Sequence, residues 1–310
     1  MGIGFGRMMQ QFDLKDYLST RKALVDSALE QLVPRPAGLQ QSVLEAARYS
    51  LFAGGKRLRP ILCMAAAEVV GSEPESVLPA ACALELIHTY SLIHDDLPAM
   101  DNDDFRRGRP TCHKAYGEAM AILAGDALLT EAFGLVARFG LNYSPAAGSA
   151  ATVLRVVEIL ARASGYQGMI GGQVIDLEAE QSEVDLETLE AMHRHKTGAL
   201  ICGALEIGAL LGGGDAEQTQ SLVRFGRHFG LAFQITDDLL DVEGDPAVMG
   251  KPAGSDQARN KKTYPAVLGM EATRAAARDH VVKAIEVLAD FDEKALPLKE
   301  MACYLPNRKA

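Results

Sequence analysis

The sequence predicts an all-α fold of about ten or more helices in a single domain over residues 1–310, on three observations. Ala, Leu, Glu and Gly are abundant, aromatic residues make up 6% of the chain and Trp is absent. This mixture favours helices over a sheet rich in β-branched and aromatic residues. No run of alternating apolar and polar residues indicates a strand. No linker or low-complexity tract divides the chain, so we expect one continuous core.

Apolar residues recur at helical spacing through most of the sequence. The segment 43–51 precedes a Gly-Gly break, and the segment 60–70 ends before a further glycine, as helices often do. The segment 78–94 is apolar almost all round, which predicts a helix buried in the middle of the protein. Further helices are expected over 115–139, 148–164, 186–211, 218–242, 263–270 and 273–290.

Charge and composition argue against several classes of function. The net charge is −10 and the sequence pI about 5.2, so a broad basic surface for nucleic acid is not expected. Five cysteines without a CxxC pair indicate neither a disulfide framework nor a zinc site. The chain start lacks the layout of a signal peptide, and no stretch reaches the roughly 18–20 uninterrupted apolar residues of a membrane span. We therefore expect a cytoplasmic protein without stable membrane insertion.

Short basic islands interrupt this acidic chain, KRLR at 56–59 and RRGR at 106–109. Lys56 and Arg59 are three residues apart and would share one helical face. Arg106 and Arg107 follow several carboxylates directly. One interpretation is mutual neutralisation in exposed salt bridges, and the other is that the guanidinium groups bind diphosphate oxygens. Islands of this kind suit a small polyanion.

Two aspartate-rich motifs, LIHDDLPAMD at 92–101 and QITDDLLD at 234–241, each place an Asp pair at the end of an apolar helix. Ionised carboxylates there are costly unless a cation compensates them, so the motifs predict two walls of one cavity. Asp237 and Asp241 are one helical turn apart and face the same way, whereas Asp238 lies off to the side. Such a pair of hard oxygen ligands suits Mg²⁺; the alternative is a solvated acidic helix end.

The first motif needs a distortion to act in the same way. Asp95 and Asp101 would lie about 240° apart on an ideal helix. Pro98 disfavours helical geometry at the residue before it and removes a backbone donor. We therefore expect the helix to end or bulge near 97–100, which brings Asp101 beside Asp95. His88, two turns earlier on the same face, is either a site residue or a core histidine with its hydrogen bonds satisfied.

Together with GGKRLRP, GMIGGQVIDL, HKTGAL, GK at 250–251 and KKTYPA at 261–266, these motifs resemble the trans-isoprenyl diphosphate synthases over roughly Val43 to Gly269, most closely the bacterial farnesyl diphosphate synthases. The resemblance implies an isoprenoid synthase fold, with helices around a central apolar cavity. It implies a prenyltransferase that condenses isopentenyl diphosphate head to tail with dimethylallyl and geranyl diphosphate. Three Mg²⁺ per active site are expected, with Mn²⁺ as an alternative ion, in a homodimer.

The resemblance also implies a role for each matching residue. The metal ligands would be Asp95, Asp101, Asp237 and Asp241. The allylic diphosphate would be bound by Arg106, Lys196, Lys251 and Lys261. Isopentenyl diphosphate would be held by Lys56, Arg59, His88 and Arg107. The carbocation would be steadied by Thr197 and Gln234. Water-linked partners of the metals would be Gln173 and Asp176.

Product length should depend on what lies below the first motif. Tyr90, with Ser91 beside it, occupies the position where the family places a bulky ring as the pocket floor, which favours a C15 product. A geranylgeranyl (C20) synthase is the alternative in the same fold, and a non-catalytic subunit of a heteromeric synthase is the alternative from another class. A terpene cyclase is less expected, since cyclases usually lack the basic set for a second diphosphate. Pro306 leaves open whether the C-terminal tail closes the site.

Overall fold

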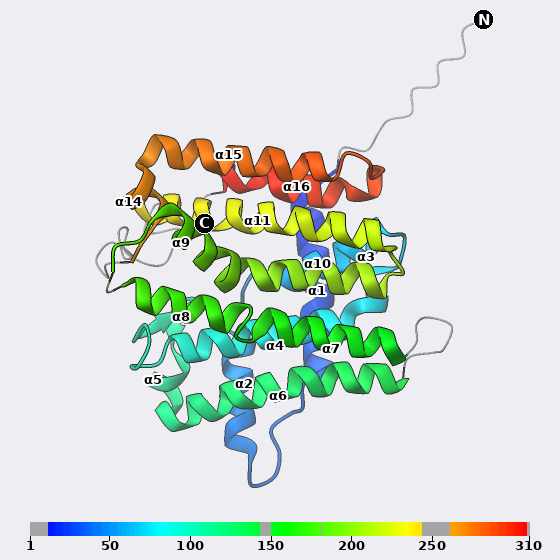
Figure 1. Cartoon of the computed structure of the whole chain (residues 1–310). Coiled ribbons are helices and arrows are strands. Elements are labelled where there is room, and N and C mark those ends of the chain that lie inside the picture. Colours follow the sequence, from blue (N-terminus) through cyan, green and yellow to red (C-terminus); the bar gives the residue numbers. More distant parts are fainter. Residues whose placement is uncertain (1–11, 143–149, 181, 244–260, 309–310) are drawn as a thin grey trace, which may run out of the picture.

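The computed structural model describes residues 12–142, 150–180, 182–243 and 261–308, and it confirms the all-α fold. The helices are α1 (Leu14–Leu32), α2 (Gln41–Leu51), α3 (Leu58–Val69), η1 (Pro74–Val77), α4 (Leu78–Asp95), α5 (Cys112–Tyr116), α6 (Glu118–Asn142), α7 (Ala150–Ser164), α8 (Met169–Ala179), α9 (Leu186–His193), η2 (Arg194–Gly198), α10 (Ala199–Leu211), α11 (Ala216–Glu243), α14 (Tyr264–Leu268), α15 (Met270–Val287), η3 (Glu293–Ala295), α16 (Leu296–Tyr304) and η4 (Leu305–Asn307). The long helices α6, α7, α10, α11 and α15 form a stack, and α1 and α2 cross it (Figure 1).

Helix α4 lies in the core, as its sequence predicts. It carries Pro79 in its first turn, where a missing N–H costs little. Buried residues cover most of it, among them Leu84, Leu86 and Ile87 at 0% exposure. It packs chiefly against α6 and also contacts α3. Burying each large aliphatic side chain contributes about 1.5–3 kcal/mol, so α4 holds the aspartates at its C-terminal end in a fixed place.

Two of the expected helices are interrupted. The segment expected over 115–139 is divided by Gly117, whose φ of +85° ends α5 before α6 begins. The segment expected over 186–211 contains η2, a π-helical turn between α9 and α10. Such turns occur frequently at functional sites. This one contains Lys196 and Thr197, two predicted site residues.

Three helices, α1, α8 and α16, lie where none is predicted. In α1 the start is marked only locally, by Asp13, whose side chain accepts the Asp16 N–H. In α8, glycines lower the helix propensity, but packing requires one of them. A Cβ on Gly172 would lie 2.1 Å from the backbone nitrogen of Lys196. A short hairpin, β1 (Phe105–Arg106) and β2 (Arg109–Pro110), is also unpredicted.

Two helical stretches, Pro74–Asp95 and Glu118–Asn142, are long and apolar enough to cross a membrane by length and composition. Buried residues make up 67% of the apolar window in the first and 39% in the second. The first is the core helix α4 with the turn before it. The second, α6, exposes more of its apolar surface, including Ile122 and Leu123.

Candidate active site

The first aspartate motif has the turn that its proline predicts. Helix α4 ends at Asp95, and the Asp101 N–H donates to the Asp95 carbonyl oxygen at 2.8 Å. The Asn102 N–H donates to the Leu97 carbonyl oxygen at 3.1 Å, with Asn102 in the left-handed region at φ +51°. Asp101 is thus folded back beside Asp95, as expected.

Each carboxylate near this motif has a donor from another element. Gln173 Nε2 of α8 donates to Asp95 Oδ1 at 2.6 Å. Lys261 Nζ lies 3.1 Å from Asp101 Oδ1, and Lys196 Nζ lies 2.5 Å from Asp176 Oδ2. The structure therefore brings together six residues assigned to the allylic site, in three pairs, from distant parts of the sequence.

Burial raises the pKa of Asp95 to about 6, although the nearby Lys196 ammonium opposes this rise. A divalent cation close to such a buried carboxyl group would stabilise its ionised form. Asp237 lines the main cavity, whereas Asp241, one turn later, is only 2% exposed. Within the described residues no three His, Cys, Asp or Glu side chains converge closely enough to hold a metal ion alone. The carboxylates of Asp95, Asp101, Asp237 and Asp241 are hard oxygen donors. They fit Mg²⁺, which binds few protein carboxylates and completes its shell with water and phosphate oxygens.

The cavity that Asp237 lines has a volume of about 750 Å³. It brings together every residue predicted for the second diphosphate, Lys56, Arg59, His88 and Arg107. Burial lowers the pKa of Arg59, and burial with the nearby Arg59 charge lowers the pKa of His88 well below its usual value. Cations that are partly desolvated and mutually repelling favour a bound anion. Phe229 and Phe233 line another part of the wall.

The Gly-Gly break shapes this cavity. Arg107 donates from Nη1 to the Gly54 carbonyl oxygen. Gly55 has φ +120°, and a Cβ there would lie 2.6 Å from Arg107 Cζ. Position 55 therefore requires a glycine for two reasons: its backbone conformation, and the space that the Arg107 guanidinium occupies.

Arg57 is a site residue that the sequence interpretation missed. It is 3% exposed and adopts φ +53°, a left-handed conformation rare for a side chain of its size. Its guanidinium donates to Glu85 Oε1 at 2.7 Å, to Asp26 Oδ1 at 2.8 Å and to the Leu51 carbonyl oxygen at 2.8 Å. Arg57 thus anchors the loop that carries Lys56. Glu85 lies inside an apolar helix, and a buried acidic residue in such a place indicates that a basic residue is buried beside it.

Arg106 is held by a carboxylate. It donates from Nε and Nη2 to Asp96 Oδ1 at 2.8 and 2.6 Å. Asp96 is 3% exposed, whereas the Arg106 side chain is 33% exposed. Of the two interpretations of the basic islands, the local salt bridge is therefore present at Arg106. Its contact with a phosphate stays a prediction, although Arg106 also lines the cavity.

The C-terminal tail reaches the cavity, where Leu305 and Arg308 line the wall. Arg308 is 6% exposed and donates to the Asp237 carboxylate and, at 3.1 Å, to the Phe233 carbonyl oxygen. Its guanidinium lies 4.3 Å from the centre of the Phe233 ring, a favourable cation–π distance. No local sequence pattern predicts that Arg308 belongs to the site, because its partners lie about 70 residues earlier in the chain.

Beneath the first motif, Tyr90 is 5% exposed, and its ring meets that of His94 edge to face with centroids 5.8 Å apart. The Tyr90 hydroxyl is buried without a hydrogen-bond partner among the residues that the structure describes. Ser91 donates to the His88 carbonyl oxygen at 2.9 Å. Lys251 lies outside the described residues.

Comparisons with known proteins agree on one kind of protein. The family model described as "Polyprenyl synthetase" matches residues 40–299. A farnesyl diphosphate synthase of Geobacillus stearothermophilus is 48% identical over 290 residues, 93% of this chain and 96% of that protein. The apo structure of an FPP/GFPP synthase from Zymomonas mobilis is 37% identical with a TM-score of 0.82, over 94% and 99% of the two chains. A geranylgeranyl pyrophosphate synthetase from Pyrococcus horikoshii Ot3 is 32% identical with a TM-score of 0.84, over 95% and 98%.

Proposed function

Because the chain belongs to the polyprenyl synthetase family, we propose that it condenses isopentenyl diphosphate with dimethylallyl and then geranyl diphosphate to give farnesyl diphosphate. The chain is a prenyltransferase, as are the relatives it matches along nearly its whole length. One observation supports the two-substrate reaction above others. A single cavity joins the second aspartate motif, through Asp237, to four basic or imidazole side chains suited to a second diphosphate.

The allylic diphosphate would bind between the two aspartate motifs. Asp95, Asp101, Asp237 and Asp241 would hold Mg²⁺, which supplies charge neutralisation to the leaving diphosphate. Lys196, beside Asp176, adds positive charge at the same place. The apolar helices around this site exclude water that would otherwise capture the carbocation.

Isopentenyl diphosphate would bind in the 750 Å³ cavity, on Lys56, Arg59, His88 and Arg107. These groups fix its diphosphate, so that its double bond faces the allylic carbon. The reaction needs no side-chain nucleophile: the double bond attacks the cation, and the released diphosphate accepts the proton that is lost. The chain's role is therefore to position two diphosphates and to stabilise developing charge.

The test is to incubate the purified protein with isopentenyl diphosphate and each allylic primer, with Mg²⁺ and with EDTA. Chromatography of the dephosphorylated products then gives their length. We expect a C15 product that requires the metal. A C20 product would favour the geranylgeranyl synthase alternative, and no turnover by the protein alone would favour the non-catalytic subunit.

Tyr90 is the proposed floor of the product pocket, since its ring is buried directly below the first motif. Replacing Tyr90 by Ala should remove the floor and give products longer than C15. Replacing Tyr90 by Phe keeps the ring and serves as the matched control. A Tyr90→Ala enzyme that still releases only C15 would show that the chain stops elsewhere.

We also propose that the protein is a cytoplasmic homodimer that pairs through α6. This helix exposes Ile122 at 45% and Leu123 at 53%, an apolar surface typical of an interface between subunits. Light scattering on the purified protein should give twice the mass of one chain, and Leu123→Glu should lower it. A monomeric wild-type protein at micromolar concentration would contradict the proposal.

A further inference from the structure

Asp238 has no role in the site described so far, although it stands beside a candidate metal ligand. It is 3% exposed and, unlike Asp237, does not line the main cavity. Keeping a carboxylate buried is costly unless its oxygens accept hydrogen bonds. The bonds that Asp238 accepts therefore indicate why it is there.

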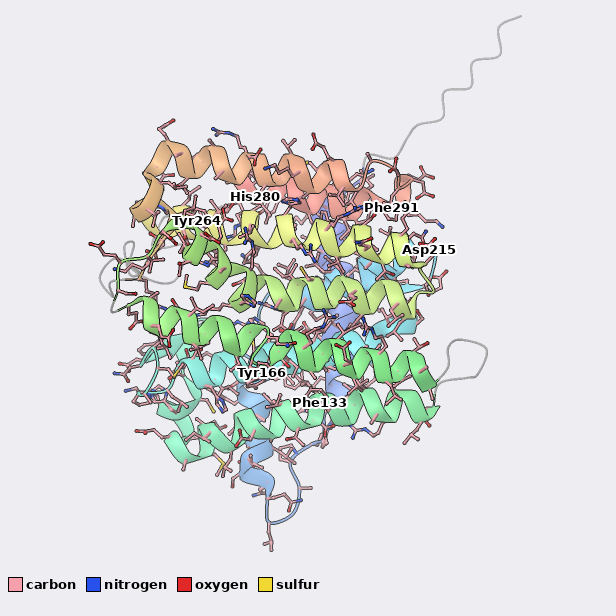
Figure 2. All side chains as sticks on the ribbon, viewed as in Figure 1. Phe133, Tyr166, Asp215, Tyr264, His280 and Phe291 are labelled. Atoms are coloured by element: carbon pink, nitrogen blue, oxygen red, sulfur yellow. The ribbon has the colours of Figure 1, made fainter. Side chains whose placement is uncertain are left out.

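Asp238 and Thr197 hold the side-chain amide of Gln234 between them. Gln234 Nε2 donates to Asp238 Oδ1 at 3.1 Å, and Thr197 Oγ1 donates to Gln234 Oε1 at 3.0 Å. Asp238 Oδ2 accepts the backbone N–H of Tyr264 at 2.9 Å and lies 3.8 Å from His193 Nε2. Tyr264, labelled in Figure 2, begins the short helix α14, which packs against α9 and α11. Three separate elements thus meet at this carboxylate.

The direction of the amide follows from the chemistry of its neighbour. Asp238 Oδ2 accepts the backbone N–H of Tyr264, and Thr197 Oγ1 donates to Gln234 Oε1. The NH₂ group of Gln234 therefore faces Asp238 Oδ1, and its oxygen faces Thr197. We propose that Asp238 is a positioning residue that fixes the oxygens of Gln234 and Thr197 toward the carbocation formed when the allylic C–O bond breaks. This inference rests on the proposed function.

Asp238→Asn tests the inference with an almost isosteric change. The buried N–H of Tyr264 still needs an acceptor, so the Asn oxygen turns to it and the Asn NH₂ group faces Gln234. Gln234 then reverses, and its NH₂ group takes the place of the oxygen. By analogy with the loss of one stabilising dipole at a reacting centre, kcat should fall about 10²- to 10³-fold. The KM values for both diphosphates should change little, because neither is held by Asp238.

A double-mutant cycle separates positioning from a merely structural role. Gln234→Leu removes the group through which Asp238 acts, so adding Asp238→Asn to it should cause no further loss of kcat. Adding Gln234→Glu to Asp238→Asn restores an oxygen toward Thr197 and should recover part of kcat. Losses that multiply, or a combination with Gln234→Glu that recovers nothing, would overturn the inference.

Asp241→Asn is the matched control, since Asp241 lies on the same helix and is 2% exposed. As a candidate metal ligand it should raise the Mg²⁺ concentration for half-maximal rate, whereas Asp238→Asn should not. If Asp238→Asn does not fold, Gln234→Glu alone carries the test: its carboxylate would face Asp238, and an unchanged kcat would overturn the inference. A wild-type protein without turnover would overturn the proposed function itself, and an active wild type with normal Asp238→Asn only this inference.

Discussion

Replacing Arg57 by Met should destabilise the protein and weaken its hold on isopentenyl diphosphate. Arg57 and Glu85 form an ion pair at 2.7 Å with both side chains 1% exposed. Glu85 Oε2 has no other hydrogen-bond partner in the described part of the chain. Removing one member of such a pair costs about 3–5 kcal/mol, because the other charge stays buried and uncompensated. The free energy of unfolding from urea titrations should fall by this amount.

The same change should act on substrate binding through Lys56, which precedes Arg57 in the cavity loop. A small displacement of a binding group can cost up to about 10²-fold, so we expect the KM for isopentenyl diphosphate to rise about tenfold. The KM for the allylic primer should change less, since its proposed ligands lie on other elements.

Two further variants decide whether the buried charge is the cause. Lys22→Met removes an exposed partner of Asp26, with Lys22 40% and Asp26 33% exposed, and should cost less than about 1 kcal/mol. The double variant Arg57→Met with Glu85→Met removes both charges and should be more stable than Arg57→Met alone. Two results would contradict this role of the buried charge. One is a free energy of unfolding for Arg57→Met within about 1 kcal/mol of the wild-type value. The other is a double variant that is no more stable than Arg57→Met alone.

Three other changes follow from the site. Gly55→Ala should raise the KM for isopentenyl diphosphate more than Gly54→Ala does, because both have positive φ but only a Cβ on Gly55 would meet Arg107. Steady-state kinetics of the two variants check this, and equal effects would contradict it. In EDTA, the stability of the wild type should fall as pH rises from 3.8 to about 6, because native Asp95 binds its proton more tightly than the unfolded chain does. The full change is about 3 kcal/mol, of which about 2 kcal/mol falls between pH 4.5 and 7.5. Urea titrations at these two pH values should show this fall in the wild type and not in Asp95→Asn, and equal falls in the two proteins would refute this origin. Arg308→Ala removes the tail cation from the cavity wall and should raise the KM for isopentenyl diphosphate several-fold, with an unchanged KM meaning that the tail is not part of that site.

The sequence predicted those parts of the fold and site that depend on local chemistry. The apolar repeat of 78–94 specifies a buried helix, and Pro98 indicates that this helix cannot continue, so that Asp101 turns back beside Asp95. The glycines of α8 lower the local helix propensity, so no helix was predicted there. Gly172 is required because it packs closely on η2, and Gly171 because it lies against the Tyr166 backbone; helix propensity does not take such tertiary contacts into account.

The partners of the charged groups could not be read from the sequence in the same way. The run KRLR shows three cations that all line the cavity, but not that Arg57 is the one that pairs with Glu85. This pairing depends on a left-handed residue before α3 and on an acid 28 positions later. The arrival of Arg308 at Asp237 depends on the packing of the last helices, which lies beyond any local pattern.

These partners also explain how so many like charges coexist before substrate arrives. Asp101 is paired with Lys261, Asp176 with Lys196 and Asp237 with Arg308. Each pair joins an acidic side chain to a cation, so neither charge is left uncompensated. Under the proposed function, the carboxylate of each pair would bind the metal and the cation would bind phosphate when a diphosphate arrives, so that both members would change partners together. The charged groups of the site would then be desolvated and paired when the protein folds. Substrate binding would exchange the partners of charges that are already in place.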